Sequence, residues 1–287
     1  MDKPKKYATA TAFRRALEHR LKSIAAKEKV LLERLRREVT FDRLLARLLR
    51  GDDAPWVLKG GYALEIRLKD ARATKDIDLA LRHTLGKARG AVLNDAILQS
   101  LRSAAALDLN DFFQFEFGDA MKDLDAAPYG GARFPVTALM DGRVFAEFHL
   151  DVGAGDVVLA PLDIAQGRDW LGFAGLPAPE FPMLSREQHF AEKVHAYTLP
   201  RPSANSRVRD MVDLVLLITS NPQMDRPRVS AAIDATFKRR KTHTMPASLQ
   251  PPPGDWKQSY AVLARPCGIS EDLDRAFEVV TAFLESL

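Results

Sequence analysis

The stretch KGGYALEIRLKDARATKDIDLAL, residues 59–81, decides how this chain is interpreted. Two adjacent glycines, Gly60 and Gly61, stand where an apolar segment gives way to a helical pattern. About fifteen positions later, two aspartates, Asp76 and Asp78, occur inside an apolar run. Because side chains alternate along a strand, both carboxylates are expected on one face while the intervening apolar residues face the core. Their Cα atoms should lie about 6.6 Å apart, from a rise of about 3.3 Å per residue.

Two carboxylates placed this close repel each other, and without a cation one of them would tend to hold a proton. A divalent metal removes this conflict, and oxygen ligands of this kind suit Mg²⁺ or Mn²⁺. Two such ions about 4 Å apart can hold the attacking and leaving oxygens of a phosphoryl displacement. The pattern therefore predicts a metal site at Asp76 and Asp78. The alternative is that both are solvated residues of an edge strand.

A third carboxylate is expected from the segment AEFHLDVGAGD, residues 146–156. In this segment polar residues alternate with apolar ones, as in a strand with one buried face. Asp151 is the first candidate for a third metal ligand beside the aspartate pair, and Glu147 is the second. The sequence leaves the choice between them open.

The two glycines have a functional and a structural interpretation. At a helix N-terminus, backbone N–H groups without Cβ obstruction can hold a phosphate. Positive charge nearby comes from Lys59, Arg67, Arg72 and Lys75. An ordinary turn from strand to helix explains Gly60 and Gly61 equally well.

A second motif lies in the helical pattern of residues 185–199. Lys193 shares a helical stripe with His189 and Tyr197 by i,i+4 spacing, beside apolar residues. Its ammonium could hold triphosphate oxygens, or it could be a lysine whose charged end simply reaches solvent. The two histidines of this helix, His189 and His195, are six residues apart and are interpreted as packing or surface residues.

Asp210 and Asp213 follow at i,i+3 spacing near the start of the next helical pattern. They could bind a metal, orient Lys193, or pair with Arg207 and Arg209. A role at the positive end of the helix dipole is a further structural alternative.

Strand and helix patterns interleave along the middle of the chain, which predicts an α+β fold with a small mixed sheet. Asp141-Gly142 indicates a two-residue hairpin, Asn94 a helix N-cap, and Ser185 with Gln188 a capping box. We expect basic N-terminal helices over residues 1–50 that pack on the core, the core itself over residues 51–165, and a mainly helical domain over residues 166–287.

The net charge of +4 is unevenly distributed, because residues 1–50 hold 15 Lys and Arg against 6 Asp and Glu. Such a surplus is consistent with binding to phosphate, although basic helices are often only solvated. The run Lys238-Arg239-Arg240-Lys241 is expected as a basic loop that either contacts RNA or is only solvated. A single cysteine excludes an internal disulfide, and the scattered histidines disfavour structural zinc. With neither a membrane-length apolar segment nor a secretory signal, a cytoplasmic protein is expected.

The motifs quoted above, with LKGGYALEIRL, RATKDIDL, EKVHAY and RVRDMVDLVLL, resemble the AbiEii/AbiGii-type toxins of type IV toxin–antitoxin pairs. These toxins belong to the DNA polymerase beta-like nucleotidyltransferase superfamily. The resemblance covers roughly Trp56 to Ile218. It implies a nucleotidyltransferase core that takes an NTP as substrate and has a separately encoded antitoxin as partner. Some relatives add nucleotides to the 3′ end of tRNA.

Residue by residue, the resemblance implies a nucleotide cradle at Gly60 and Gly61 and metal ligands at Asp76 and Asp78. It also implies functional side chains at three further positions, namely Lys193, Asp210 and Asp213. Members of the family often carry Gly-Ser in the first motif, whereas this chain has Gly61-Tyr62. A cradle here would therefore depend on backbone donors alone.

Three functions remain open at this stage. The first is a toxin-like nucleotidyltransferase that modifies the 3′ end of an RNA, expected to be tRNA, and that holds its backbone with the basic segments. The second is the same chemistry on a small-molecule or protein hydroxyl. The third is a catalytically inactive module that binds RNA or a partner. Fold and site are common to the first two, so the sequence does not separate them.

Overall fold

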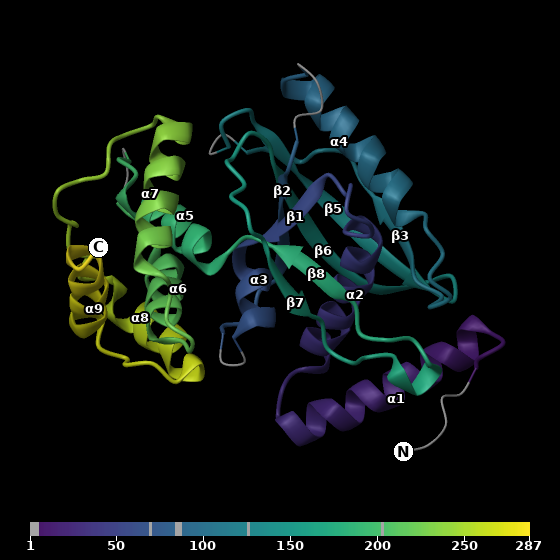
Figure 1. The fold of residues 1–287 in the computed structure, drawn as a ribbon. Helices are drawn as coiled ribbons and strands as arrows, with labels where there is room; N and C mark the ends of the chain where they lie inside the picture. The colour runs from purple at the N-terminus through teal and green to yellow at the C-terminus, as the bar shows by residue number, and fades with distance from the viewer. Residues whose placement is uncertain (1–5, 69–70, 84–87, 125–126, 202–203) are drawn as a thin grey trace. The chain divides into compact units, whose positions relative to one another are not determined.

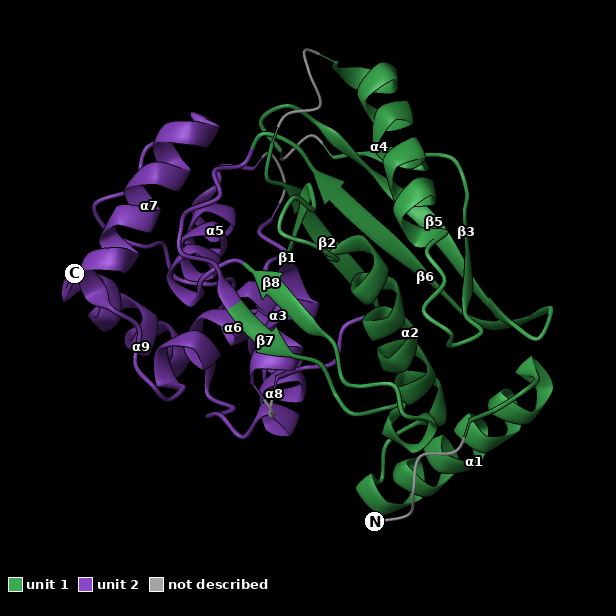
Figure 2. Cartoon of the chain, turned by 45° about the vertical axis from the view of Figure 1, so that its right-hand side comes forward, with its two compact units in different colours: residues 1–58, 75–155, 164–183 green, residues 59–74, 156–163, 184–287 purple. Residues whose placement is uncertain are grey.

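The computed structural model describes residues 6–68, 71–83, 88–124, 127–201 and 204–287. The chain forms two compact units that interleave along the sequence (Figure 2). Unit 1 comprises residues 1–58, 75–155 and 164–183, and unit 2 comprises residues 59–74, 156–163 and 184–287. Each unit therefore combines segments that are distant in sequence, whereas the domains expected from the sequence are consecutive stretches.

Among the described residues, eight strands form one mixed sheet, most of which belongs to unit 1 (Figure 1). The strand order is β3-β5-β6-β2-β1-β8-β7, and the short β4 pairs with β5. β6 pairs antiparallel with β5 and parallel with β2. The strands are β1 (Trp56–Lys59), β2 (Asp76–Leu81), β3 (Gln114–Phe117), β4 (Lys122–Asp123), β5 (Gly131–Met140), β6 (Arg143–Gly153), β7 (Asp163–Gln166) and β8 (Glu180–Met183).

The long hairpin of β5 and β6 follows directly from the sequence. Asp141 and Gly142 both adopt positive φ angles, of 59° and 66°. A two-residue turn of this kind matches the twist of antiparallel strands. From Ala132 onward every second residue of β5 is buried, as a strand with one core face requires. The predicted hairpin is confirmed, and it sets the position of β6 beside β2.

The helices of unit 1 are α1 (Ala10–Glu28), α2 (Leu32–Leu48) and α4 (Gly90–Ala105). Helix α1 buries its residues at i, i+4 and i+8, namely Phe13, Leu17 and Leu21. These side chains share a core cluster with residues of α2, β5 and β6. Helix α1 therefore packs against the rest of unit 1 through one apolar stripe.

Much of the basic surplus at the N-terminus has a structural use inside unit 1. The guanidinium of Arg14 donates to the backbone carbonyls of Met140, Arg143 and Val144, and so ties α1 to the hairpin. On α2, Arg43 and Arg47 both donate to the fully buried carboxylate of Asp111.

Unit 2 is mainly helical. Its helices are α3 (Gly60–Arg67), α5 (Arg186–Thr198), α6 (Val208–Thr219), α7 (Arg226–Arg240), α8 (Trp256–Ala264) and α9 (Leu273–Glu285). Helix α6 contacts α5, α8 and α9, and every residue of it from Asp210 to Leu217 is buried. The chain around α6 therefore forms the core of this unit.

Ser185 caps α5 as predicted, because its hydroxyl accepts a hydrogen bond from the N–H of Gln188. The second half of a capping box does not form. The side chain of Gln188 instead bonds the backbone of Val157 and Leu159. This side chain therefore anchors residues 156–163 to α5 within unit 2.

The α+β fold class is confirmed, with three corrections to individual elements. β7 and β8 enlarge the sheet and come from a Gly/Pro-rich passage in which no strand was predicted. Asn94 is not an N-cap, because α4 already begins at Gly90; its side chain donates to Asp123. The basic run at residues 238–241 is not a loop, because Lys238 to Arg240 form the last turn of α7.

Candidate active site

The aspartate pair lies on one face of β2, as the alternation predicts. Asp76 and Asp78 are half-buried, while Ile77 and Leu79 are fully buried on the other face. The buried residues hold the strand in the core, so the carboxylates project from a fixed backbone. This geometry brings two acidic side chains together at the start of the strand.

The register of β2 against β6 places a third carboxylate beside this pair. Asp78 is directly opposite Asp151 on the neighbouring parallel strand, and Asp76 is opposite His149. Neighbouring strands lie about 4.8 Å apart, so the side chains of Asp78 and Asp151 stand next to each other. Glu147 is exposed and lies four residues before Asp151 along β6, opposite Thr137 of β5. Of the two candidates, Asp151 is the neighbour of the aspartate pair.

A cation that the sequence interpretation missed lies among these carboxylates. Arg133, opposite Asp151 on β5, donates from Nε and Nη2 to both carboxylate oxygens of Asp151 at 2.7 and 2.8 Å. Its Nη2 also lies 3.6 Å from an oxygen of Asp76. The hydrogen bond to Asp151, with the charges of all three aspartates, raises the pKa of Arg133 above its ordinary value. The face is therefore an arginine–carboxylate cluster.

The donor set of this face suits a hard divalent cation, because it offers three carboxylates on adjacent strands. As the side chains stand, however, both oxygens of Asp151 bind Arg133. In the described parts of the chain, no group of three or more His, Cys, Asp or Glu side chains is arranged to hold a metal ion. The predicted ligands fit Mg²⁺ or Mn²⁺ in chemistry and in backbone register, and a three-carboxylate site requires Asp151 to leave Arg133.

The two glycines lie in unit 2 at the first turn of α3, and each has a structural reason to be glycine. Gly60 has a φ of 66°, a conformation that other residues adopt only with strain. A Cβ on Gly61 would lie 2.8 Å from the hydroxyl oxygen of Thr74, which is too close. The first turn of α3 also has no side-chain cap. A phosphate cradle at these residues stays a prediction.

Lys59, the residue before these glycines, is part of an ion cluster in unit 2. Its Nζ lies 2.7 Å from a carboxylate oxygen of Asp156 and 3.4 Å from one of Glu192. Burial alone would lower the pKa of Lys59, but these two carboxylates raise it above the ordinary value. Arg240, from the basic run of α7, also binds Asp156 and is mostly buried, so that residue is a structural cation.

The residues of the second motif come together in unit 2. The Nζ of Lys193 lies 2.8 Å from Asp210 and 2.8 Å from Asp213. Arg72 donates from Nε and Nη2 to both oxygens of Asp213, at 2.9 and 2.8 Å. Burial would raise the pKa of Asp213, but Lys193 and Arg72 lower it to about 2. Of the open alternatives, the structure therefore favours orientation of Lys193 by Asp210 and Asp213.

The alternative pairing with Arg207 is made weakly, at 3.5 Å from Asp210. His189, one turn before Lys193, is fully buried, and neither of its ring nitrogens has a hydrogen-bond partner among the described residues. Burial, followed by the charges of Lys193 and Arg67, lowers the pKa of His189 well below its ordinary value. The sequence interpretation of His189 as a packing residue agrees with this position.

The sequence interpretation missed Arg133, and it gave Arg72 only as positive charge near the glycines, not as the partner of Asp213. Arg133 had a visible signal, since it is an arginine inside the apolar strand pattern GARFPVTALM. Such a residue in a half-buried strand needs an acidic neighbour. Arg72 lies outside any helix or strand, so no periodicity indicated its pairing with Asp213.

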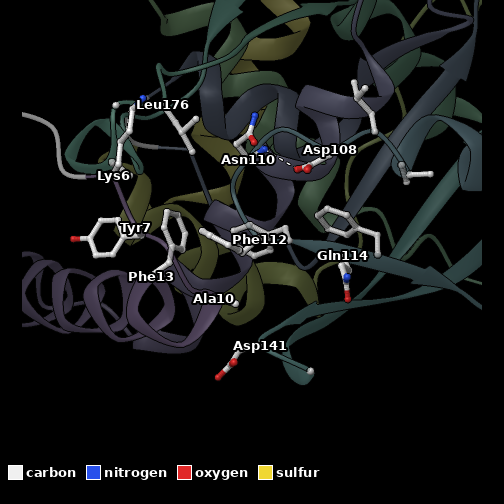
Figure 3. Close-up of a pocket in the computed structure, with 18 of the residues that line it drawn as sticks. Lys6, Tyr7, Ala10, Phe13, Asp108, Asn110, Phe112, Gln114, Asp141 and Leu176 are labelled. Carbon is white, nitrogen blue, oxygen red and sulfur yellow. Dashed lines mark hydrogen bonds between the residues drawn. The ribbon is translucent and has the colours of Figure 1, made fainter.

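A separate cavity of about 1040 Å³ lies in unit 1, at the hairpin end of β5 and β6 (Figure 3). Tyr7, Phe13 and Phe112 line it, with Asp141 at the hairpin turn. Asp151 lies eight residues along β6 from its first residue, which corresponds to about 26 Å. None of the predicted site residues lines this cavity.

None of the helices in the described part of the chain combines the length and apolarity that a bilayer crossing requires.

The family model of the nucleotidyl transferase AbiEii toxin, type IV TA system, matches residues 43–280. Among solved structures, the nucleotidyltransferase toxin MenT4 from Mycobacterium tuberculosis H37Rv is similar in fold, with 18% identity and a TM-score of 0.58. That alignment covers 89% of this chain and 85% of MenT4. JHP933 from Helicobacter pylori aligns with 14% identity and a TM-score of 0.48, over 88% of this chain and 94% of JHP933. A comparison with curated protein sequences gives no match.

Proposed function

The chain belongs to the AbiEii nucleotidyl transferase toxin family of type IV toxin–antitoxin systems, and we propose that it transfers a nucleotide from an NTP to the 3′ end of an RNA. The proposed acceptor is tRNA, and the proposed location of the enzyme is the cytoplasm. The family makes the chain a nucleotidyltransferase and implies a cognate antitoxin as partner. The RNA acceptor, the NTP and the dependence on a divalent metal are our proposals.

The observation that carries the proposal is the register of Asp78 against Asp151, with Asp76 on the same strand face. In nucleotidyl transfer, the acceptor 3′ oxygen forms a bond to the α-phosphorus while the bond to the bridging oxygen breaks and pyrophosphate leaves. Such a displacement needs little covalent chemistry from the protein, so positioning and charge provide most of the catalysis. Bound Mg²⁺ or Mn²⁺ would neutralise the charge that develops on the attacking and leaving oxygens.

The side chains of this chain would then divide the work. Asp76, Asp78 and Asp151 would hold the cation, and Arg133 would release Asp151 when the cation binds. Backbone donors at Gly60 and Gly61 would bind the nucleotide phosphates. The family resemblance supports the roles of Asp76, Asp78 and the two glycines, whereas the roles of Asp151 and Arg133 are supported by strand register and by their ion pair.

For Lys193 of unit 2, the family resemblance implies a functional role, and Asp210 and Asp213 would fix the position of its side chain. The ion pairs of Lys193 at 2.8 Å to each carboxylate support this positioning, because they restrict its long side chain. Asp210 and Asp213 are therefore positioning residues in this proposal, because they act through Lys193.

A labelling experiment tests the function directly. Purified protein is incubated with each labelled NTP, Mg²⁺ and total RNA, and RNA is then resolved from protein. Label in RNA that disappears with EDTA and with Asp78→Asn is the expected result. Label in protein, or in a small molecule, would instead support transfer to another hydroxyl. Folded protein that labels neither fraction would contradict the catalytic proposal and support an inactive binding module.

A further inference from the structure

A second cavity, of about 600 Å³, lies beside the aspartate pair and belongs entirely to unit 1. Side chains from α2, from the residue before β2, and from β5 and β6 line it. Among them are Arg37, Lys75, Asp76, Arg133, Thr137 and His149. It therefore adjoins a proposed metal ligand and combines three cations from three different segments of the chain.

Arg37 is an unusual arginine for α2. The other four arginines of this helix each bind a carboxylate of unit 1. The Nε of Arg37, by contrast, is buried and has no hydrogen-bond partner among the described residues. A buried donor without an acceptor is unfavourable, so no protein partner holds Arg37 through this nitrogen, and its guanidinium can turn toward an anion in the cavity.

Lys75 and Arg133 extend the positive charge from Arg37 toward Asp76. Lys75 is exposed and has no ion-pair partner in the described part of the chain. Arg133 is about one-third exposed and already neutralises Asp151. Two of the three cations are thus available to a ligand without breaking an ion pair in unit 1.

From these observations we propose that this cavity, hereafter the Arg37 cavity, binds the phosphate backbone of the acceptor strand next to its reacting 3′ end. This inference rests on the proposed function and assigns the acceptor side of the site. Arg37 and Lys75 bind successive phosphodiester groups, and the terminal ribose lies toward Asp76.

The chemistry of the walls favours a phosphodiester over the triphosphate of the NTP. Triphosphates are commonly held by clustered backbone N–H groups, but β5 and β6 pair with each other along this wall and Pro135 has no N–H. Long cationic side chains on separate segments suit the single charges of a nucleic-acid backbone. Asp76 and Glu147 also line the cavity and would repel a ligand with several negative charges in one place.

Fluorescence anisotropy of a 5′-fluorescein-labelled 12-nucleotide single-stranded RNA, without NTP and without divalent ions, tests the inference. Arg37→Gln and Lys75→Gln should each weaken RNA binding about tenfold, because each removes one charged contact to a phosphate. Each should also reduce the slope of log Kd against log salt by about 0.7, the value for one phosphate of a single strand. Arg37→Lys keeps the charge and should lose less affinity than Arg37→Gln.

Lys22→Gln is the matched control, because Lys22 is an exposed lysine of α1 that does not line the Arg37 cavity. It should leave RNA affinity within about twofold of wild type. Equal losses in all three glutamine variants would show that overall charge matters rather than this cavity. Circular dichroism of each variant separates lost binding from lost folding.

Calorimetric titration with the NTP distinguishes the two sources of phosphate. Unchanged NTP affinity in Arg37→Gln, with weakened RNA binding, is the expected result. Weakened NTP binding with unchanged RNA binding would place the triphosphate in the cavity and overturn the proposal. Wild-type RNA affinity in Arg37→Gln, in an enzyme that does label RNA, would refute the cavity while leaving the proposed function intact. Conversely, failure to label RNA would refute the function while the RNA-binding measurements still test the cavity.

Discussion

Asp213→Asn is expected to cost the protein much of its stability, and this expectation can be worked out from the buried network of unit 2. The carboxylate of Asp213 is fully buried and accepts hydrogen bonds from Arg72 on both oxygens, with Lys193 at 2.8 Å. The amide of Asn would leave two buried cations without their shared counter-charge. Removal of one partner from a buried ion pair typically costs about 3–5 kcal/mol.

The pKa of Asp213 gives a second measure of how much its carboxylate stabilises the fold. Lys193 and Arg72 hold this pKa at about 2, against an ordinary value of 3.8, despite the opposing effect of burial. That difference corresponds to roughly 2–3 kcal/mol of stabilisation at neutral pH. Because the folded pKa is the lower one, the stabilisation is fully present above about pH 5 and is lost as the pH falls toward 2. At pH 3 about 1 kcal/mol of it should already be gone.

Urea unfolding of wild type and Asp213→Asn at pH 7 and pH 3 measures both quantities. The free energy of unfolding should be about 3 kcal/mol lower in the variant than in wild type at pH 7. At pH 3 this difference between the two proteins should be about 1 kcal/mol smaller. Asp274→Asn is the matched control, because it removes an exposed carboxylate paired with Lys257. Such surface pairs contribute little, so this variant should lose less than about 1 kcal/mol.

A loss below 1 kcal/mol in Asp213→Asn at pH 7 would refute the reasoning. It would mean that water, or a rearranged side chain, replaces the carboxylate between Lys193 and Arg72. A variant with wild-type stability and no transferase activity would assign Asp213 a direct role in the reaction instead of the positioning of Lys193.

Three further outcomes follow from the described geometry. Asp78→Asn should reduce nucleotide transfer by at least about 10³-fold, because a ligand for the proposed cation is lost. Its melting temperature should stay equal or rise, because charge repulsion is relieved, and a large fall in melting temperature would indicate a structural role. Gly61→Ala should destabilise the chain by about 1–3 kcal/mol in urea unfolding, because the added Cβ would lie 2.8 Å from the Thr74 hydroxyl. Unchanged stability would show that Thr74 can move away. Arg133→Gln should tighten Mn²⁺ binding in an electron paramagnetic resonance titration, because Asp151 loses its competing cation, and unchanged or weaker binding would argue against Asp151 as a ligand.

Several features of the site could be predicted from local sequence because they depend on local periodicity. The alternation around Ile77 places Asp76 and Asp78 on one face whatever the rest of the chain does. The Asp141-Gly142 turn determines a hairpin because few other residues accept two positive φ angles in succession. The Ser185 cap likewise needs contacts within one helical turn.

Other predictions from the sequence were wrong for identifiable reasons. Asn94 is a good N-cap residue by type, yet α4 starts one turn earlier, at Gly90, and Asn94 lies inside the helix with its side chain buried and bonded to Asp123 of a distant segment. The basic run that ends in Lys241 looked solvated, but Arg240 binds the buried Asp156 of a distant segment. Local composition does not show such a partner.

The sequence by itself determined the α+β class, the aspartate pair, the hairpin and the positions of the main helices, since each depends on residues a few positions apart. Tertiary structure alone decided that Asp151 rather than Glu147 stands beside Asp78, and that Arg133 binds it. The physical reason is strand register: a shift of one residue would turn every side chain of β6 to the opposite face. That register is set by the packing of buried side chains from segments about 70 residues apart, which no local pattern encodes.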